Sequence, residues 1–245
     1  MESEKGTLIG TLGTCREENK AFIALADHFY NQGLPVPKVY CHNREYSCYL
    51  QQDLGDITLY NAIEGGRSKG NYDPSEKRLL MKVIKALPLL QFKGAEGLDF
   101  GVCYPQPAFD ERMISFDLNY FKYCFLKATG LEFSEIQLDN DFRKMSRVLL
   151  SDASETFLYR DFQARNVMLV NEEPYFIDFQ GGRKGPIYYD VASFIWQAKA
   201  NYSEELKDEL LETYLKALKQ FIPVDEKHFH RQLRHFVLFR TLQVL

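Results

Sequence analysis

The sequence lacks any apolar run long enough to cross a membrane. A spanning helix needs about 20 mainly apolar residues, and polar or charged residues interrupt every apolar stretch of this 245-residue chain before that length. The first residues, MESEK, are charged, and no apolar core of a signal peptide follows them. We therefore expect a cytoplasmic protein with no membrane partner.

An excess of positive charge is also missing. The formal net charge is -4, whereas general nucleic-acid and membrane-surface binders carry a basic footprint. Local basic groups such as Arg183 and Lys184 remain able to meet a phosphate. The composition therefore argues against nucleic acid as a direct partner of this domain.

Neither disulfides nor a zinc site is indicated. The five cysteines lack the paired spacing of a metal site, and an odd number leaves one over from any full set of disulfides, so we expect reduced thiols. His228, His230 and His235 come closest to a cluster, but they lie in a helical pattern without partner ligands. The chain shows no internal repeat or low-complexity linker. Its 45% hydrophobic content suffices for one large domain or two lobes that share a cleft.

What the sequence does contain is a stretch, residues 156–193, in which short strand-like runs alternate with polar residues. Strand-favouring apolar and aromatic residues fill three of these runs, at 156–159, 167–170 and 175–179. Residues 171–174 are expected to form a turn between the last two runs. The stretch therefore predicts a loop between the first two strands and a four-residue turn between the last two.

Three oxygen-bearing side chains occupy particular places in this pattern. Asp161 and Asn166 flank the loop, and Asp178 ends the last strand. Magnesium takes oxygen ligands, usually one or two protein groups together with phosphate oxygens of a substrate. Asn166 and Asp178 suit that role, which leaves Asp161 to orient a hydroxyl and accept its proton. Loop Asp and Asn residues also commonly cap turns, so the combination and not any single residue favours a site.

The same residues carry a family resemblance. The segment YRDFQARN at 159–166, followed by IDF at 177–179, resembles the catalytic loop and metal-binding motif of the protein-kinase-like fold, in the aminoglycoside phosphotransferase and choline kinase family. Gln180 stands where protein kinases have glycine, which favours the small-molecule branch. The segments QDLGD at 52–56 and GPIYYDVAS at 185–193 look most like bacterial kinases that phosphorylate the anomeric hydroxyl of N-acetylmuramate or N-acetylglucosamine.

The resemblance spans nearly the whole chain and implies an α+β, two-lobe fold. Residues 1–55 would form a truncated N-terminal β lobe that binds nucleotide, and residues 56–245 a mainly helical lobe with the catalytic loop and an acceptor pocket. The implied cofactors are ATP and Mg²⁺, and the implied acceptor is a small molecule, most readily an amino sugar of cell-wall metabolism. The implied site residues are Asp161 and Arg160 for catalysis, Asn166 and Asp178 for the metal, Gln52, Asp53 and Leu54 for adenine, and Asp117, Asn119 and Arg165 for the acceptor.

Periodicity predicts the remaining elements. We expect strands at 7–12 and 47–52, an edge or connecting segment at 34–39, and helices at 17–31, 73–90, 115–126, 140–150, 190–200, 203–221 and 225–245. The helix at 73–90 has the clearest start, with Asp73 as N-cap, Pro74 at the first position and Glu76 at the third. Asp190 is open to two interpretations, a helix N-cap or a carboxylate that steadies the catalytic loop through Arg160.

Part of the resembled fold is missing. The family would have a glycine-rich strand–turn–strand over the phosphates and a lysine on the next strand, but the first expected strand carries no lysine and Lys5 lies just outside it. We expect a fragment of a longer protein, in which an additional C-terminal domain is possible. Glu17 and Glu18 are candidates for the glutamate that pairs the missing lysine, or are surface residues of a first helical turn.

Two other functions stay open. An incomplete nucleotide lobe, and Tyr159 where many relatives have histidine, would suit a catalytically impaired kinase-like binding or regulatory module. Phosphorylation of an aminoglycoside or of choline would instead require an acidic or aromatic pocket for a cationic acceptor.

Overall fold

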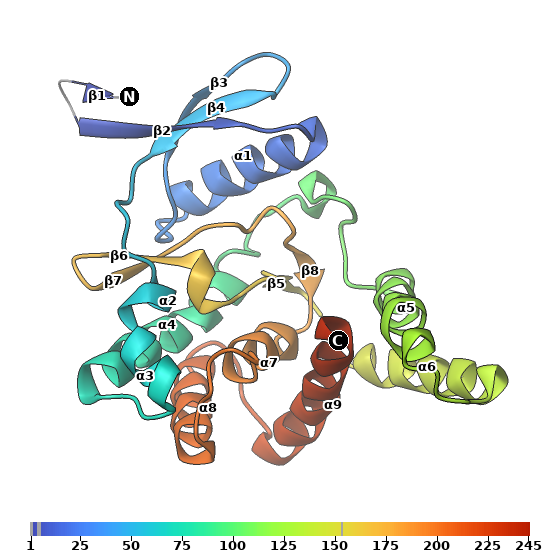
Figure 1. Ribbon diagram of the computed structural model, residues 1–245. Helices are drawn as coiled ribbons and strands as arrows, with labels where there is room; N and C mark the ends of the chain where they lie inside the picture. The colour runs from blue at the N-terminus through green and yellow to red at the C-terminus, as the bar shows by residue number, and fades with distance from the viewer. Residues whose placement is uncertain (1, 4–5, 153) are drawn as a thin grey trace.

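A small antiparallel sheet with one helix against it forms the upper part of the molecule, and helices form most of the rest (Figure 1). The computed structural model describes residues 2–3, 6–152 and 154–245, so that Lys5 lies outside them. None of the described helices is both long enough and apolar enough to cross a membrane.

The sheet has the strand order β1-β2-β4-β3, with β1 at Glu2–Ser3, β2 at Gly6–Leu12, β3 at Val39–His42 and β4 at Cys48–Gln52. All its pairings are antiparallel, and β2 and β4 align from Leu8 opposite Gln52 to Leu12 opposite Cys48. The strands expected at 7–12 and 47–52 are confirmed. The edge strand begins only at Val39, after Pro35 and Pro37, because proline cannot donate to a ladder.

Helix α1, Arg16–Asn31, lies against this sheet and confirms the helix expected at 17–31 (Figure 1). Its apolar face, which includes Phe22, Leu25 and Phe29, is buried. The chain leaves the helix through Gly33, whose φ of 72° suits a residue without a Cβ.

The larger part of the chain contains the remaining α-helices and short helical turns. The α-helices are α2 (Leu59–Ala62), α3 (Glu64–Lys69), α4 (Pro74–Phe92), α5 (Glu111–Tyr120), α6 (Glu135–Leu149), α7 (Tyr188–Ile195), α8 (Glu204–Leu218) and α9 (Glu226–Val244). The short turns are η1 (Phe100–Val102), η2 (Phe121–Leu126), η3 (Lys127–Thr129) and η4 (Ala164–Asn166). The capping box predicted from Asp73 and Glu76 is present at the start of α4.

Several boundaries differ from expectation for local reasons. Helix α5 starts before residue 115, because Asp110 accepts a hydrogen bond from the Met113 N–H (2.9 Å) and caps it there. Helix α7 ends at Ile195 and not at residue 200, because the side chain of Gln197 donates to the Phe194 carbonyl (2.8 Å) that a continuing helix would use. Asp190 lies inside α7, so its interpretation as an N-cap is wrong.

Two small two-stranded ladders hold the stretch from 156 to 193. Strand β5, Thr156–Leu158, pairs with β8, Arg183–Gly185, and β6, Val167–Val170, pairs with β7, Glu173–Phe176. The first two expected strand runs are therefore present. The third is shifted toward the N-terminus, because Glu173 and Pro174 already pair with β6 and the strand ends at Phe176. The expectation that Asp178 ends a strand is wrong, since Asp178 lies in the segment after β7. The hairpin turn is tighter than predicted, because Asn171 and Glu172 both have positive φ (53° and 62°) and complete it alone.

Aromatic rings join the upper sheet and helix to these ladders. Phe179 stacks on Phe22 of α1 with ring centroids 5.0 Å apart, and Phe29 meets Phe179 and Phe157 edge to face at 5.2 and 4.9 Å. All four rings are buried. Asp178 directly precedes Phe179, so this ring cluster fixes the segment that carries Asp178 against α1.

Candidate active site

The loop that carries Asp161 is held at its start by a buried carboxylate. The two oxygens of Asp190, on α7, accept hydrogen bonds from the main-chain N–H groups of Tyr159 (2.8 Å) and Arg160 (2.9 Å). Burial raises the pKa of Asp190 to about 7, against the effect of these two hydrogen bonds. Asp190 thus steadies the loop as one interpretation expected, but through main-chain groups and not through the Arg160 guanidinium.

Asn166 ties the two ends of the site together. Its side-chain amide nitrogen donates to the main-chain carbonyl of Asp161 (2.8 Å). Its main-chain carbonyl accepts from the N–H of Ile177 (3.1 Å), the residue before Asp178. Only 6% of Asn166 is exposed. The hydrogen bonds therefore bring the loop between Asp161 and Asn166 next to the segment that holds Asp178.

Two residues of the site have a left-handed backbone. Arg160 has φ 77° and Asp178 has φ 67°, a region that residues with a Cβ rarely adopt. The Asp178 carboxylate is exposed and accepts a hydrogen bond from the side chain of Gln180 (2.8 Å). Both conformations turn the chain sharply at a functional candidate.

A cleft of about 380 Å³ lies between α1, the sheet and this segment, and we call it the sheet-side cleft. It is lined by Thr11, Glu18, Asn19, Phe22, Tyr49, Gln51, Asn166, Ile177, Asp178 and Gln180. The two predicted metal ligands, Asn166 and Asp178, therefore share one cavity. Glu18 also faces it, 3.5 Å from the Gln180 amide, whereas Glu17 is exposed outside it. The sequence could have favoured Glu18 over Glu17, because Glu18 lies four residues before the apolar Phe22 and therefore on the same face of the helix.

The donor set fits a hard cation. With its amide nitrogen donated to Asp161, Asn166 keeps an oxygen for a ligand, and Asp178 supplies a carboxylate beside it. No group of three or more His, Cys, Asp or Glu side chains in the described residues could hold a metal by itself. A magnesium ion here would therefore depend on Asn166, Asp178 and oxygens of a substrate.

The residues expected near adenine lie at the end of β4. The N–H of Gln52 already donates to the carbonyl of Lys38 (2.8 Å). The carboxylate of Asp53 accepts hydrogen bonds from the Thr7 side chain and the Gly55 N–H, which lower its pKa. The N–H of Gln52 is therefore already used within the sheet. Of the residues expected near adenine, Asp53 and Leu54 remain as candidates for main-chain contacts with it. On the strand itself, Tyr49 and Gln51 line the cleft, and the sequence did not single them out.

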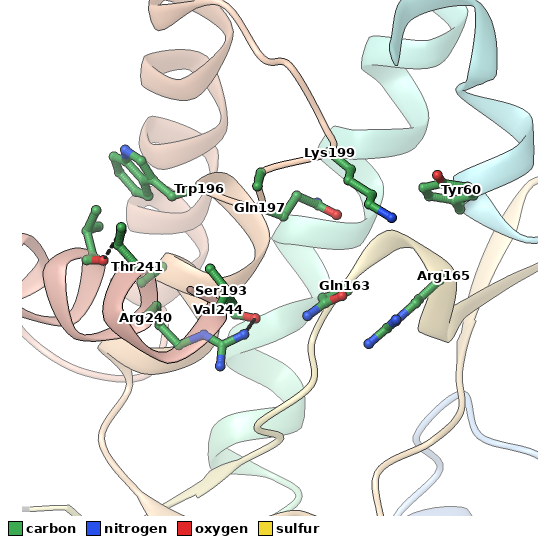
Figure 2. Close-up of a pocket in the computed structure, with 13 residues that line it drawn as sticks. Tyr60, Gln163, Arg165, Ser193, Trp196, Gln197, Lys199, Arg240, Thr241 and Val244 are labelled. Atoms are coloured by element: carbon green, nitrogen blue, oxygen red, sulfur yellow. Dashed lines mark hydrogen bonds between the residues drawn. The ribbon is translucent and has the colours of Figure 1, made fainter. Parts of the chain in front are cut away.

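A larger pocket of about 710 Å³ lies on the other side of the same loop, among α2, α7 and α9, and we call it the helix-side pocket (Figure 2). It is lined by Tyr60, Gln163, Arg165, Ala192, Ser193, Trp196, Gln197, Ala198, Lys199, Val237, Arg240, Thr241 and Val244. Arg165 is the one predicted acceptor residue in it. The others are contributed by segments far apart in the sequence, which no local pattern brings together.

The two remaining acceptor candidates lie elsewhere. Asp117 is buried on α5, where it accepts from the Gln243 amide (2.7 Å), and burial raises its pKa against the opposing charge of Arg160. It lines a small hollow with Arg160 and Arg183. Asn119 is exposed on α5. Neither lines the sheet-side cleft or the helix-side pocket.

Comparison with known proteins identifies the family of the chain. Residues 4–231 match the model of the phosphotransferase enzyme family. An N-acetylmuramate/N-acetylglucosamine kinase from Neisseria meningitidis serogroup B is 29% identical over 217 residues, which are 85% of this chain and 61% of the relative. A kinase of the same name from Pseudomonas aeruginosa is 25% identical over 205 residues, 82% of this chain and 56% of the relative. The chain spans less than two thirds of the length of these curated relatives.

Solved structures with the same fold act on several acceptors. Plasmodium vivax ethanolamine kinase aligns with a TM-score of 0.63 at 14% identity, over 96% of this chain and 68% of that chain. An aminoglycoside phosphotransferase from Streptomyces rimosus, in complex with ADP and streptomycin, aligns with a TM-score of 0.57 at 13% identity, over 99% and 89%. Both alignments show the kinase-like fold that the sequence predicted.

Proposed function

Because the chain belongs to the phosphotransferase enzyme family, we propose that it transfers the terminal phosphoryl group of ATP to a hydroxyl of an amino sugar. The observation that carries the proposal is the hydrogen-bonded arrangement of Asp161, Asn166 and the Asp178 segment beside the sheet-side cleft. Similarity to kinases for N-acetylmuramate and N-acetylglucosamine supports an amino sugar as the acceptor.

In this proposal one lobe binds the nucleotide and the other binds the acceptor. Residues 1–55 hold the nucleotide against the sheet, with main-chain groups of Asp53 and Leu54 near adenine, and residues 56–245 hold the acceptor. Asn166 and Asp178 hold a magnesium ion, which when bound neutralises charge on the phosphate oxygens. Arg160, through its fixed main chain, aims the side chain that follows it.

The proton is handled by Asp161. Its carboxylate orients the acceptor hydroxyl and takes its proton as the hydroxyl oxygen attacks the terminal phosphorus of ATP. The bond from that phosphorus to the bridging oxygen breaks, and ADP leaves with the electron pair. The products are a sugar phosphate, ADP and the proton now on Asp161.

Asp161→Asn tests this role, because an amide keeps the shape of the carboxylate but cannot accept the proton. We expect kcat to fall by about 10² to 10⁴ while ATP binding is retained. ADP release in the presence of N-acetylglucosamine or N-acetylmuramate measures the first effect, and equilibrium binding of ATP the second. Asp208→Asn is the matched control, because Asp208 is exposed on α8 and forms no ion pair with the described residues.

Full turnover in Asp161→Asn would remove this residue from the mechanism. Failure of the unmodified chain to phosphorylate either sugar, together with no binding of ATP, would contradict the proposed activity. That result would favour a kinase-like binding module, for which one observation speaks: strands β1 to β4 contain no lysine that could meet phosphates.

A further inference from the structure

All the charged side chains that line the helix-side pocket are positive. Among the described residues that line it are Arg165, Lys199 and Arg240, and none is Asp or Glu. Its volume of about 710 Å³ falls within the range of roughly 300–1,000 Å³ usual for small-molecule sites. Trp196 and Tyr60 add aromatic surface. The lining is thus that of a small-molecule site with a preference for negative charge.

Two of these three cations have no acidic partner in the described part of the chain. Arg165 and Lys199 are exposed, and neither forms an ion pair with any carboxylate in the described part of the chain, although many other surface lysines do. The Arg240 guanidinium donates to the Tyr189 hydroxyl (2.9 Å) and the Ser193 hydroxyl (3.1 Å), both uncharged. Its Nε is buried without a partner in the described residues. The Arg240 charge also acts on the buried carboxylates of Asp190 and Asp117. The two exposed cations, Arg165 and Lys199, are therefore the ones that act on whatever occupies this pocket.

The pocket also adjoins the proposed site of reaction. Gln163 has an extended backbone (φ -140°, ψ 158°), and its neighbours Phe162 and Ala164 are buried in the core. Side chains alternate along extended backbone, so Gln163 points away from the core and into the pocket, two residues after Asp161. In Figure 2, Lys199 reaches from the segment after α7 toward the loop that carries Gln163 and Arg165. A molecule in the pocket would lie beside the loop that bears the catalytic carboxylate.

We propose that the helix-side pocket is the acceptor site and that it selects an acceptor bearing a carboxylate, which Arg165 and Lys199 bind. This inference rests on the proposed function and narrows it. N-acetylmuramate differs from N-acetylglucosamine by an acidic lactyl ether, so the acid is the better acceptor. Cationic acceptors such as ethanolamine and streptomycin are disfavoured, because like charges repel in a pocket without acidic residues.

Binding can be measured without turnover, because Trp196 is the only tryptophan of the chain and lines the pocket. Titration of the 245-residue chain with each sugar, followed by tryptophan fluorescence, gives two dissociation constants. We expect N-acetylmuramate to bind about 10 to 100 times more tightly than N-acetylglucosamine, and this ratio to shrink with added salt, which screens exposed charges.

Lys199→Gln and Arg165→Gln should each reduce the ratio, and the double variant should bring it close to one. Lys227→Gln and Arg234→Gln are matched controls, because both side chains are exposed on α9 outside the pocket and have no ion pair in the described residues. The controls should keep the ratio of the unmodified chain, which separates binding by these two cations from a general effect of net charge.

Equal affinities for the two sugars, or a ratio that the double variant leaves unchanged, would overturn the inference. Tighter binding of N-acetylglucosamine 6-phosphate than of N-acetylmuramate would overturn the carboxylate assignment. Phosphorylation of both sugars with equal kcat/KM would refute the selectivity but leave the proposed function intact. Selective binding of the acid without any turnover would support the pocket and contradict the activity.

Discussion

Asp190 is fully buried, yet its two oxygens accept hydrogen bonds from consecutive main-chain N–H groups of the loop that carries Asp161. Its pKa is raised from the ordinary 3.8 to about 7 by burial. The folded chain therefore binds this proton more tightly than the unfolded chain does. By linkage, the stabilisation from Asp190 is complete below an ordinary aspartate pKa and is lost as the pH rises through the folded value.

Asp190→Asn should remove this pH dependence. The amide also places an N–H₂ group where an oxygen now accepts, which leaves a buried donor unsatisfied at a cost of about 1–3 kcal/mol. We therefore expect a less stable variant whose disadvantage is larger at about pH 5 than at about pH 8. Urea denaturation of both proteins at each pH gives the comparison, and parallel curves of stability against pH would contradict it.

Single residues also mark what the sequence revealed about the site. Asp161, Asn166 and Asp178 follow from their places relative to strand-like runs, and the structure brings their segments together; their chemical roles stay predictions. Lys199, Trp196 and Arg240 were not foreseen as members of a pocket. They are ordinary surface or helix residues in their own segments, and only tertiary packing makes them neighbours.

At the scale of elements, helix α1 is positioned by the rings that it packs against the catalytic segment. Phe22 lies between Tyr49 of β4 and Phe179, with ring centroids 5.1 and 5.0 Å away. The next turns of the same helix contribute Phe29 to the cluster, and the preceding turn contributes Glu18 to the sheet-side cleft. The stack therefore sets both stability and the shape of the cleft.

Phe22→Ala should lower the free energy of unfolding by about 3–5 kcal/mol, the range for removing a buried ring. It should also weaken ATP binding, because α1 loses the contact that aligns Glu18. Denaturant unfolding and ATP titration measure the two effects. Phe116→Ala is the control, because Phe116 is 65% exposed and the loss of its ring should change little. An equal effect of both substitutions would argue against a special role of the ring stack around Phe22.

Helix boundaries show where sequence reasoning succeeds. The start of α4 was predictable because Asp73, Pro74 and Glu76 act on backbone groups within one turn. The end of α7 was not, because the Gln197 side chain takes over a carbonyl without any glycine or proline to signal a stop.

For the whole molecule, the α+β kinase-like fold that the family resemblance implied is confirmed. The division into lobes at residue 55 stays a proposal. What the sequence could not supply was the course of connecting segments, which places the helix-side pocket among α2, α7 and α9. The net charge of -4 gave no indication of a pocket with cationic side chains. Such a pocket became visible only once the positions of the connecting segments were known.

Ligand binding should stabilise the whole molecule in a metal-dependent way. At about 100 times its Kd, a ligand adds about 2.7 kcal/mol, which for a chain of this size raises Tm by roughly 5–10 °C. We expect this shift with ATP and magnesium together, and a smaller one with ATP alone. Asp178→Ala should abolish the difference that magnesium makes, whereas Asp208→Ala should keep it. Differential scanning fluorimetry would decide, and a magnesium effect that persists in Asp178→Ala would remove this residue as a ligand.

The left-handed backbone of Arg160 and Asp178 has an evolutionary consequence. Each such conformation costs a residue with a Cβ about 1–2 kcal/mol, and glycine at either position would relieve that cost. Selection for stability alone would therefore place glycine on both sides of the catalytic loop. The arginine and the aspartate at these positions therefore hold their proposed roles at a cost in the stability of the fold.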